Sequence, residues 1–162
     1  MATYRTTRNI EASVIDFLKS ILESTWTDVN VEKSFAKIYE IALPSICVSS
    51  ENTVYNKIQV GDNSFERNVN IIIDLFCTND GQRLDLKDTL IDGLKNGLPY
   101  YDYTTTKSGR TTAVTSKPQN GRIRILTLTD NPVNIDVDKD NLDVHDRFRH
   151  RLSLTISLGR IE

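Results

Sequence analysis

The residues best suited to chemistry form an acidic loop at 130–146. Three of its aspartates have the spacing of the first three ligands of an EF-hand calcium loop. The sixth position of such a loop should be glycine and is Asn141, and the twelfth should be glutamate and is Arg147, which would repel the ion. The pattern therefore favours a solvated acidic loop, or one that faces a basic partner, over a calcium site. The three aspartates are Asp136, Asp138 and Asp140.

The residue types that usually act as nucleophiles, bases and metal ligands are sparse. The two histidines, His145 and His150, are five positions apart, which places them on opposite faces of a strand. Cys47 and Cys77 lie in apolar runs without a close-spaced partner, which indicates buried thiols rather than a disulfide or a zinc site. The sequence contains no Walker loop, HExxH, GxGxxG or nucleophile elbow. These patterns predict neither an enzyme nor a bound cofactor.

Basic residues gather late in the chain, where the segment 103–129 contains no Asp or Glu. Its cations are Lys107, Arg110, Lys117, Arg122 and Arg124. Three further arginines alternate along the last expected strand, namely Arg147, Arg149 and Arg151. If the two late strands pair, their five arginines form one patch. Two interpretations stay open: charge pairing with the acidic loop, in the chain or between subunits, or a surface that tolerates a passing phosphate backbone. The net charge of −2 argues against a dedicated DNA-binding protein.

The hydrophobic pattern predicts two helices. Apolar residues recur at helical spacing over 9–25, with Asn9 as the expected N-cap. The second helix is expected to begin at Asp85, with Asp88 at the capping-box position, and to end at Asn96–Gly97. Three tyrosines follow within four positions, an arrangement typical of a sheet rim or an interface. They are Tyr100, Tyr101 and Tyr103.

The remaining elements are expected to be strands of one domain spanning residues 1–162. The expected strands are 35–43, 45–48, 53–60, 68–78, 123–129 and 148–158. The 68–78 segment has one wholly apolar face and one mixed face, which favours a central strand in which Asp74 needs a partner. Residues 104–120 are rich in threonine and poor in apolar side chains, and are expected to form a long protruding loop or β-arm. This order predicts an α+β fold, with a mainly antiparallel sheet covered on one face by both helices.

The apolar stretches are short, and the first residues lack a hydrophobic signal region. Neither a membrane span nor export is therefore expected, and the chain is expected to be made as a soluble protein in a reducing cytosol.

Three phrases of the sequence, FAKIYEIALPSICV, FERNVNIIIDLFCTND and LDLKDTLIDGLKNGL, follow one another between the first helix and the late strands. In this order and hydrophobic phrasing, over 10–98 and the last strand, the chain resembles the tail terminator, or tail-completion, proteins of tailed bacteriophages. The resemblance implies a non-enzymatic virion protein, assembled in the host cytoplasm. It implies a hexameric ring that caps the tail tube, stops its growth and meets the head–neck connector, while the genome passes through the lumen without specific contacts.

A closed ring needs two complementary patches on each subunit. The candidates for contacts with other copies, the tail-tube protein or the connector are Tyr100, Tyr101, Tyr103, Lys107, Arg110, Lys117, Asp136, Asp138 and Asp140. The candidates for a DNA-facing lumen or a further interface are Arg122, Arg124, Arg147, Arg149 and Arg151. Alternatives are another ring-forming neck protein, such as a head–tail stopper or adaptor, a tube initiator, a ligand-binding or enzymatic α+β domain, and a nucleic-acid-binding module.

Overall fold

The computed structural model describes residues 6–33, 38–61, 63–133 and 138–161. Its elements are α1 (Thr6–Leu22), β1 (Asn30–Glu32), β2 (Ser45–Asn56), β3 (Phe65–Cys77), α3 (Asp80–Leu94), β4 (Leu98–Tyr101), β5 (Thr104–Ser108), β6 (Thr111–Ser116), β7 (Gln119–Pro132), the 3-10 helix η2 (Lys139–Asn141) and β8 (Phe148–Ile161). Six strands form a twisted sheet in the order β1-β2-β3-β8-β7-β4, while β5 and β6 form a separate hairpin. Only the β1–β2 pair is parallel among the strand pairs in these ranges. The expected α+β class is confirmed.

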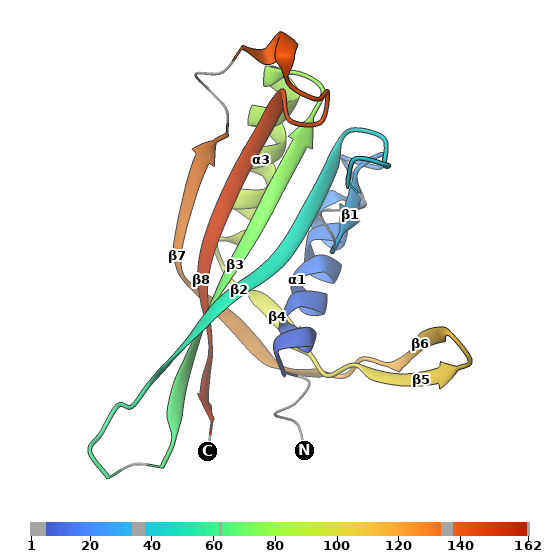
Figure 1. Cartoon of the computed structure of the whole chain (residues 1–162). Helices are drawn as coiled ribbons and strands as arrows, with labels where there is room; N and C mark the ends of the chain where they lie inside the picture. The colour runs from blue at the N-terminus through green and yellow to red at the C-terminus, as the bar shows by residue number, and fades with distance from the viewer. Residues whose placement is uncertain (1–5, 34–37, 62, 134–137, 162) are drawn as a thin grey trace.

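Both helices cover the same face of the sheet (Figure 1) and share one core with it. The apolar stripe of α1 and the leucines of α3 pack on the central strands β3 and β8. The fully buried side chains of this core include Ile10, Leu18, Leu86, Leu90, Leu94, Ile71, Ile73, Leu75 and Leu152. The helices and the sheet bury this core together. The ends of β2 and β3 extend past both helices, so no helix covers them (Figure 1).

Both helices begin earlier than the sequence predicts. The first begins at Thr6, so Asn9 is no N-cap: it is buried inside α1, and its Nδ2 donates to the Tyr100 hydroxyl at 3.3 Å. The second begins at Asp80, because Asn79 is extended and its side chain accepts the Gln82 amide at 2.8 Å. The predicted caps Asp85 and Asp88 therefore lie inside α3.

The predicted strand boundaries also change. Residues 38–43 form turns rather than a strand, and 35–37 lie outside the described residues. The predicted strand 45–48 and the first half of the predicted strand 53–60 belong to one strand, β2, with a register shift between Ser50 and Thr53, whereas residues 57–60 form bends and a turn. At the other side of the sheet, β7 runs from Gln119 to Pro132. Its first residues, 119–120, were predicted to belong to the arm, and its last residues, 130–132, to the acidic loop.

Cys47 and Cys77 are buried free thiols, as predicted. Burial raises the pKa of Cys47 to about 11 and that of Cys77 to about 12, so both remain protonated thiols at neutral pH. Within the described ranges, no helix is both long enough and apolar enough to cross a membrane.

Candidate interaction surfaces

Asp74 finds the partner that the mixed face of its strand predicts. Its carboxylate is fully buried in β3 and lies opposite Arg151 of β8 in the sheet register. The Arg149 Nη2 donates to Asp74 Oδ2 at 2.8 Å, and the Arg151 Nε and Nη2 donate to its two oxygens at 2.8 and 3.0 Å. The hydrogen bond to Asp74 raises the pKa of Arg151 above its ordinary value. Both arginines are therefore part of an internal ion-pair cluster.

The predicted single patch of five arginines is wrong. The strands β7 and β8 do pair, but their antiparallel register sets Arg124 opposite Ser157 and Arg151 opposite Asn131. Arg124 and Asn131 are seven positions apart on β7, which is about 23 Å of strand. The arginines therefore divide into two groups near opposite ends of the same strand pair. In the group near the 130–146 loop, Arg147 donates from Nε to the Leu142 carbonyl oxygen at 3.3 Å.

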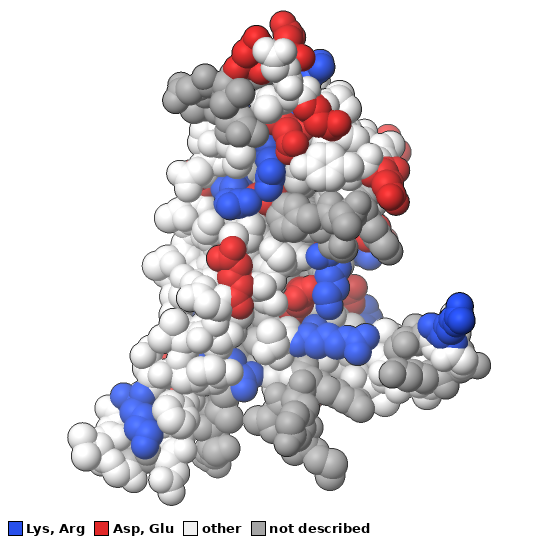
Figure 2. Space-filling model, in the orientation of Figure 1, with Lys and Arg blue, Asp and Glu red and all other residues white. Residues whose placement is uncertain are grey.

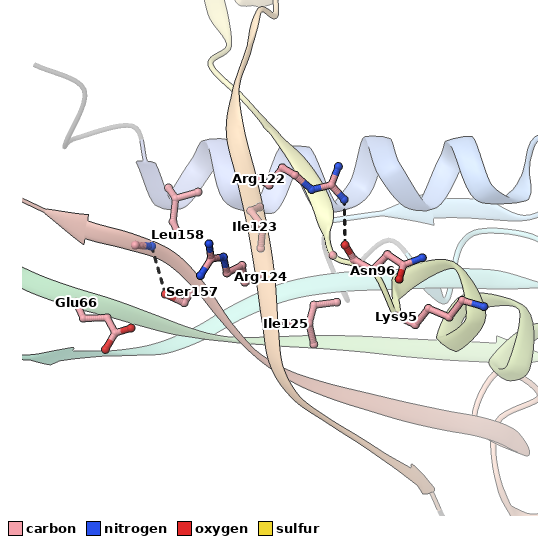
Figure 3. A pocket seen from close by; sticks show the side chains of 11 residues that line it. Glu66, Lys95, Asn96, Arg122, Ile123, Arg124, Ile125, Ser157 and Leu158 are labelled. Atoms are coloured by element: carbon pink, nitrogen blue, oxygen red, sulfur yellow. Dashed lines mark hydrogen bonds between the residues drawn. The ribbon is translucent and has the colours of Figure 1, made fainter.

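A basic pocket of about 690 Å³ lies where the end of α3 meets β7 and β8 (Figure 3). Three of its side chains are cations, Lys95, Arg122 and Arg124, and one is a carboxylate, Glu66. Arg122 Nη2 donates to the Asn96 carbonyl oxygen at 3.0 Å, which fixes that guanidinium beside the end of α3. The exposed Arg124 guanidinium has no hydrogen bond or ion pair with any described residue. The pocket thus offers uncompensated positive charge.

The tyrosines and Lys117 fasten the start of the β5–β6 hairpin to α1. Tyr103 donates to Asp16 Oδ2 at 2.7 Å, and Lys117 Nζ lies 3.2 Å from the same oxygen. Burial and Asp16 together raise the pKa of Tyr103. Tyr100 is buried, and the ring of Tyr101 lies under Lys117 Nζ at 5.6 Å. These residues have contacts inside the chain, and an additional role between subunits stays a prediction.

The remaining predicted contact residues lie at the two ends of the molecule. Arg110 is exposed at the turn of the β5–β6 hairpin, and Asp138 and Asp140 are exposed around η2. Asp138 Oδ1 accepts the Asp140 amide at 3.1 Å, so it stabilises its own turn. The side chain of Lys107 and all of Asp136 lie outside the described part of the chain. No group of three or more potential metal ligands occurs among the described residues.

Exposed apolar side chains that the sequence did not predict lie at the end of the β2–β3 hairpin. Five large side chains there are exposed, between 39% for Phe65 and 108% for Val60. The rings of Tyr55 and Phe65 contact edge to face, with their centroids 6.3 Å apart. Figure 1 shows the hairpin projecting beyond α1 and α3. The hairpin end, as we name it, consists of Val54, Tyr55, Ile58, Val60 and Phe65.

The pKa values of His145 and His150 are shifted in opposite directions. His150 is buried and its Nδ1 accepts Arg83 Nη1 at 2.8 Å, while Asp130 and Lys87 lie on its other side. Burial and the Arg83 charge lower the pKa of His150. His145 lies in the turn before β8, not on a strand, and contacts the Ile41 carbonyl oxygen at 3.0 Å. Burial opposes its charge, but hydrogen bonds to Ile41 and Asp143 outweigh burial and raise the pKa of His145.

Replacing each histidine with glutamine should change the pH dependence of stability in opposite directions. The unfolded chain binds a proton at His150 more readily than the folded chain, so this residue lowers stability as the pH falls below about 6.5. His145 has a raised pKa and contributes stability at low pH that is lost as the pH rises through its folded pKa. His150→Gln should therefore reduce the loss of Tm between pH 8 and pH 5, and His145→Gln should increase it. Equal Tm profiles for both variants would contradict these assignments.

No protein-family model matches the sequence, and no curated protein matches it either.

Proposed function

We propose that this chain is a structural protein of a bacteriophage tail. It assembles into a hexameric ring that caps the tail tube, ends tube polymerisation and joins the tail to the head–neck connector. In this proposal the β5–β6 hairpin is a protruding arm that reaches a neighbouring subunit, and the assembled protein resides in the virion. The order of elements supports the proposal in part: α1, the long strand β3, α3 and the late strands follow the order on which the resemblance rests, whereas residues 38–43 of the expected extended run form turns.

The hairpin end is the observation that carries the proposal. Its five apolar side chains lie on one projecting hairpin, beyond the reach of the helices that cover the rest of the sheet. Several large exposed apolar side chains on one projecting hairpin favour a site of protein contact. A subunit of an assembly buries such a surface when it meets its neighbours.

The direct test is assembly of the purified protein, alone and with the cognate tail-tube protein. Native mass spectrometry over a concentration series should show a discrete hexamer. Electron microscopy of tube assembly reactions should show shorter tubes when the protein is added, because capped ends no longer grow. A protein that stays monomeric at every concentration and leaves tube length unchanged would contradict the proposal.

Charge placed on the hairpin end should prevent assembly without unfolding the subunit. The double variant Ile58→Asp/Val60→Asp changes two exposed side chains, since Ile58 is 49% exposed and Val60 is 108% exposed in the monomer. The free energy of unfolding should therefore change by no more than about 0.5 kcal/mol per site. Tube shortening should fall by about tenfold or more, because two carboxylates would be desolvated in the contact.

The matched control is Leu84→Asp, an exposed leucine on α3 away from the hairpin. Its capping activity should equal that of the wild type. Normal capping by the double variant would show that the hairpin end stays in solvent in the assembly.

A further inference from the structure

Exposed carboxylates gather at one end of the strand pair β7–β8, and the basic pocket lies near its other end. Figure 2 shows Asp and Glu side chains clustered over the end that carries η2. Val144, which is 52% exposed, follows the exposed Asp143 in the same loop. The Asp140 carboxylate has no hydrogen bond or ion pair with the residues that the structure describes. We name this surface the acidic knob; it consists of Asp138, Asp140, Asp143 and Val144.

The basic pocket is complementary to the acidic knob in both charge and polarity. Its three cations outnumber its one carboxylate, and Ile125 and Leu158 add apolar wall. A partner that suits it carries carboxylates beside an apolar side chain, as the acidic knob does with Val144. A nucleic-acid backbone fits less well, because it offers no apolar side chain to pack against Ile125 and Leu158, and the chain as a whole has a net charge of −2.

The two surfaces of one chain cannot meet each other. The acidic knob follows the end of β7 at Pro132, whereas the pocket residue Arg124 lies eight positions earlier on the same strand. Eight residues of extended strand span about 26 Å, and β7 pairs with β8 over this length. The complementary charges therefore cannot pair within one chain, whereas a second copy can supply the opposite surface to each of them.

We propose that the acidic knob of one copy docks into the basic pocket of a second copy. The contact uses two different surfaces, so it is heterologous and can repeat from subunit to subunit until a ring closes. The inference rests on the proposed ring and specifies its subunit contact. Asp140 and Arg124 pair across this contact, since each lacks a partner among the described residues of its own chain.

Charge reversal and its rescue test this contact. Arg124→Asp and Asp140→Arg are expected each to raise the concentration needed for ring formation by about tenfold or more, measured by native mass spectrometry. The double variant Arg124→Asp/Asp140→Arg should return to within about threefold of the wild type, because the opposite charges again face each other. Lys19→Asp is the matched control, since it makes the same charge change as Arg124→Asp on the exposed face of α1 and should leave the ring unchanged.

Three outcomes would overturn the contact: rings that form normally in both single variants, a double variant no better than the singles, or a wild-type chain that stays monomeric. Fluorescence anisotropy with a labelled 20-base-pair DNA duplex tests whether the basic pocket binds a nucleic-acid backbone instead. Duplex binding that Arg124→Asp abolishes while the ring stays intact would overturn the contact and assign the pocket to phosphate. The proposed function has a separate readout, because a charge-dependent ring that fails to shorten tubes would support the contact and contradict the capping role.

Discussion

Replacing Asp74 with asparagine is expected to lower the free energy of unfolding by about 3 kcal/mol. Asp74 is fully buried and accepts three hydrogen bonds from the guanidinium groups of Arg149 and Arg151. A neutral side chain leaves both cations without their shared counter-charge. The effect falls at the lower end of the range for broken buried ion pairs, because the Arg151 side chain is 37% exposed and regains water. Thermal unfolding should show a decrease in Tm of about 6–12 °C for a chain of this size.

The control for this variant is Asp92→Asn on α3. Asp92 pairs with Lys95, but both side chains are mostly exposed. The pair is therefore expected to contribute less than about 1 kcal/mol. Comparable stability of the Asp74 and Asp92 variants would show that the Asp74 cluster is hydrated and that burial does not determine its contribution.

The Asp74 cluster shows both the reach and the limit of sequence reasoning. Alternation along 68–78 places Asp74 on the partly polar face of a central strand, and this is sufficient to predict that it needs a partner. The partner itself depends on how β8 aligns with β3, a contact between residues 77 positions apart. The same missing register explains the wrong arginine patch, because alternation assigns a face to Arg124 and Arg151 but not their positions along the strand pair.

The helix boundaries show a different limit, which comes from competing caps. Asn79, Asp80 and Asp85 all precede or begin the leucine stripe of α3, and each has a side chain able to cap a helix. The end of β3 at Cys77 decides between them, because the chain turns there and Asn79 is the first extended residue able to accept the Gln82 amide. Within α1, Asn9 instead meets Tyr100, a contact across 91 residues.

The hairpin end was missed for a geometric reason. Apolar residues in partial alternation over 53–60 predict a strand, but not whether it is buried. Burial also requires a helix long enough to reach that part of the strand, and the sequence does not show where α1 and α3 lie along β2. The stop at Asn96–Gly97 was predicted correctly, because it depends only on the local backbone: Gly97 has a φ of +73°.

Replacing Gly97 with alanine is expected to lower the free energy of unfolding by about 3 kcal/mol. The left-handed backbone of Gly97 alone costs alanine about 1 kcal/mol. In addition, an added Cβ would lie 2.6 Å from the Ile123 carbonyl oxygen, so β4 must shift away from its pairing with β7. Chemical denaturation should show a lower midpoint with a similar slope, as expected when the native state alone is strained.

Gly109→Ala separates these two causes. Gly109 also has a left-handed backbone, with a φ of +61°, but nothing lies within 4 Å of an added Cβ. It should therefore lose only the backbone contribution of about 1 kcal/mol. The difference between the variants measures how rigidly β7 holds its position beside the end of α3. Gly97 and Ile123 also line the basic pocket. A large difference in stability between the two variants would therefore mean that the pocket has a rigid backbone. Equal losses would show that β4 and β7 separate easily, and that the pocket can change shape when a partner docks.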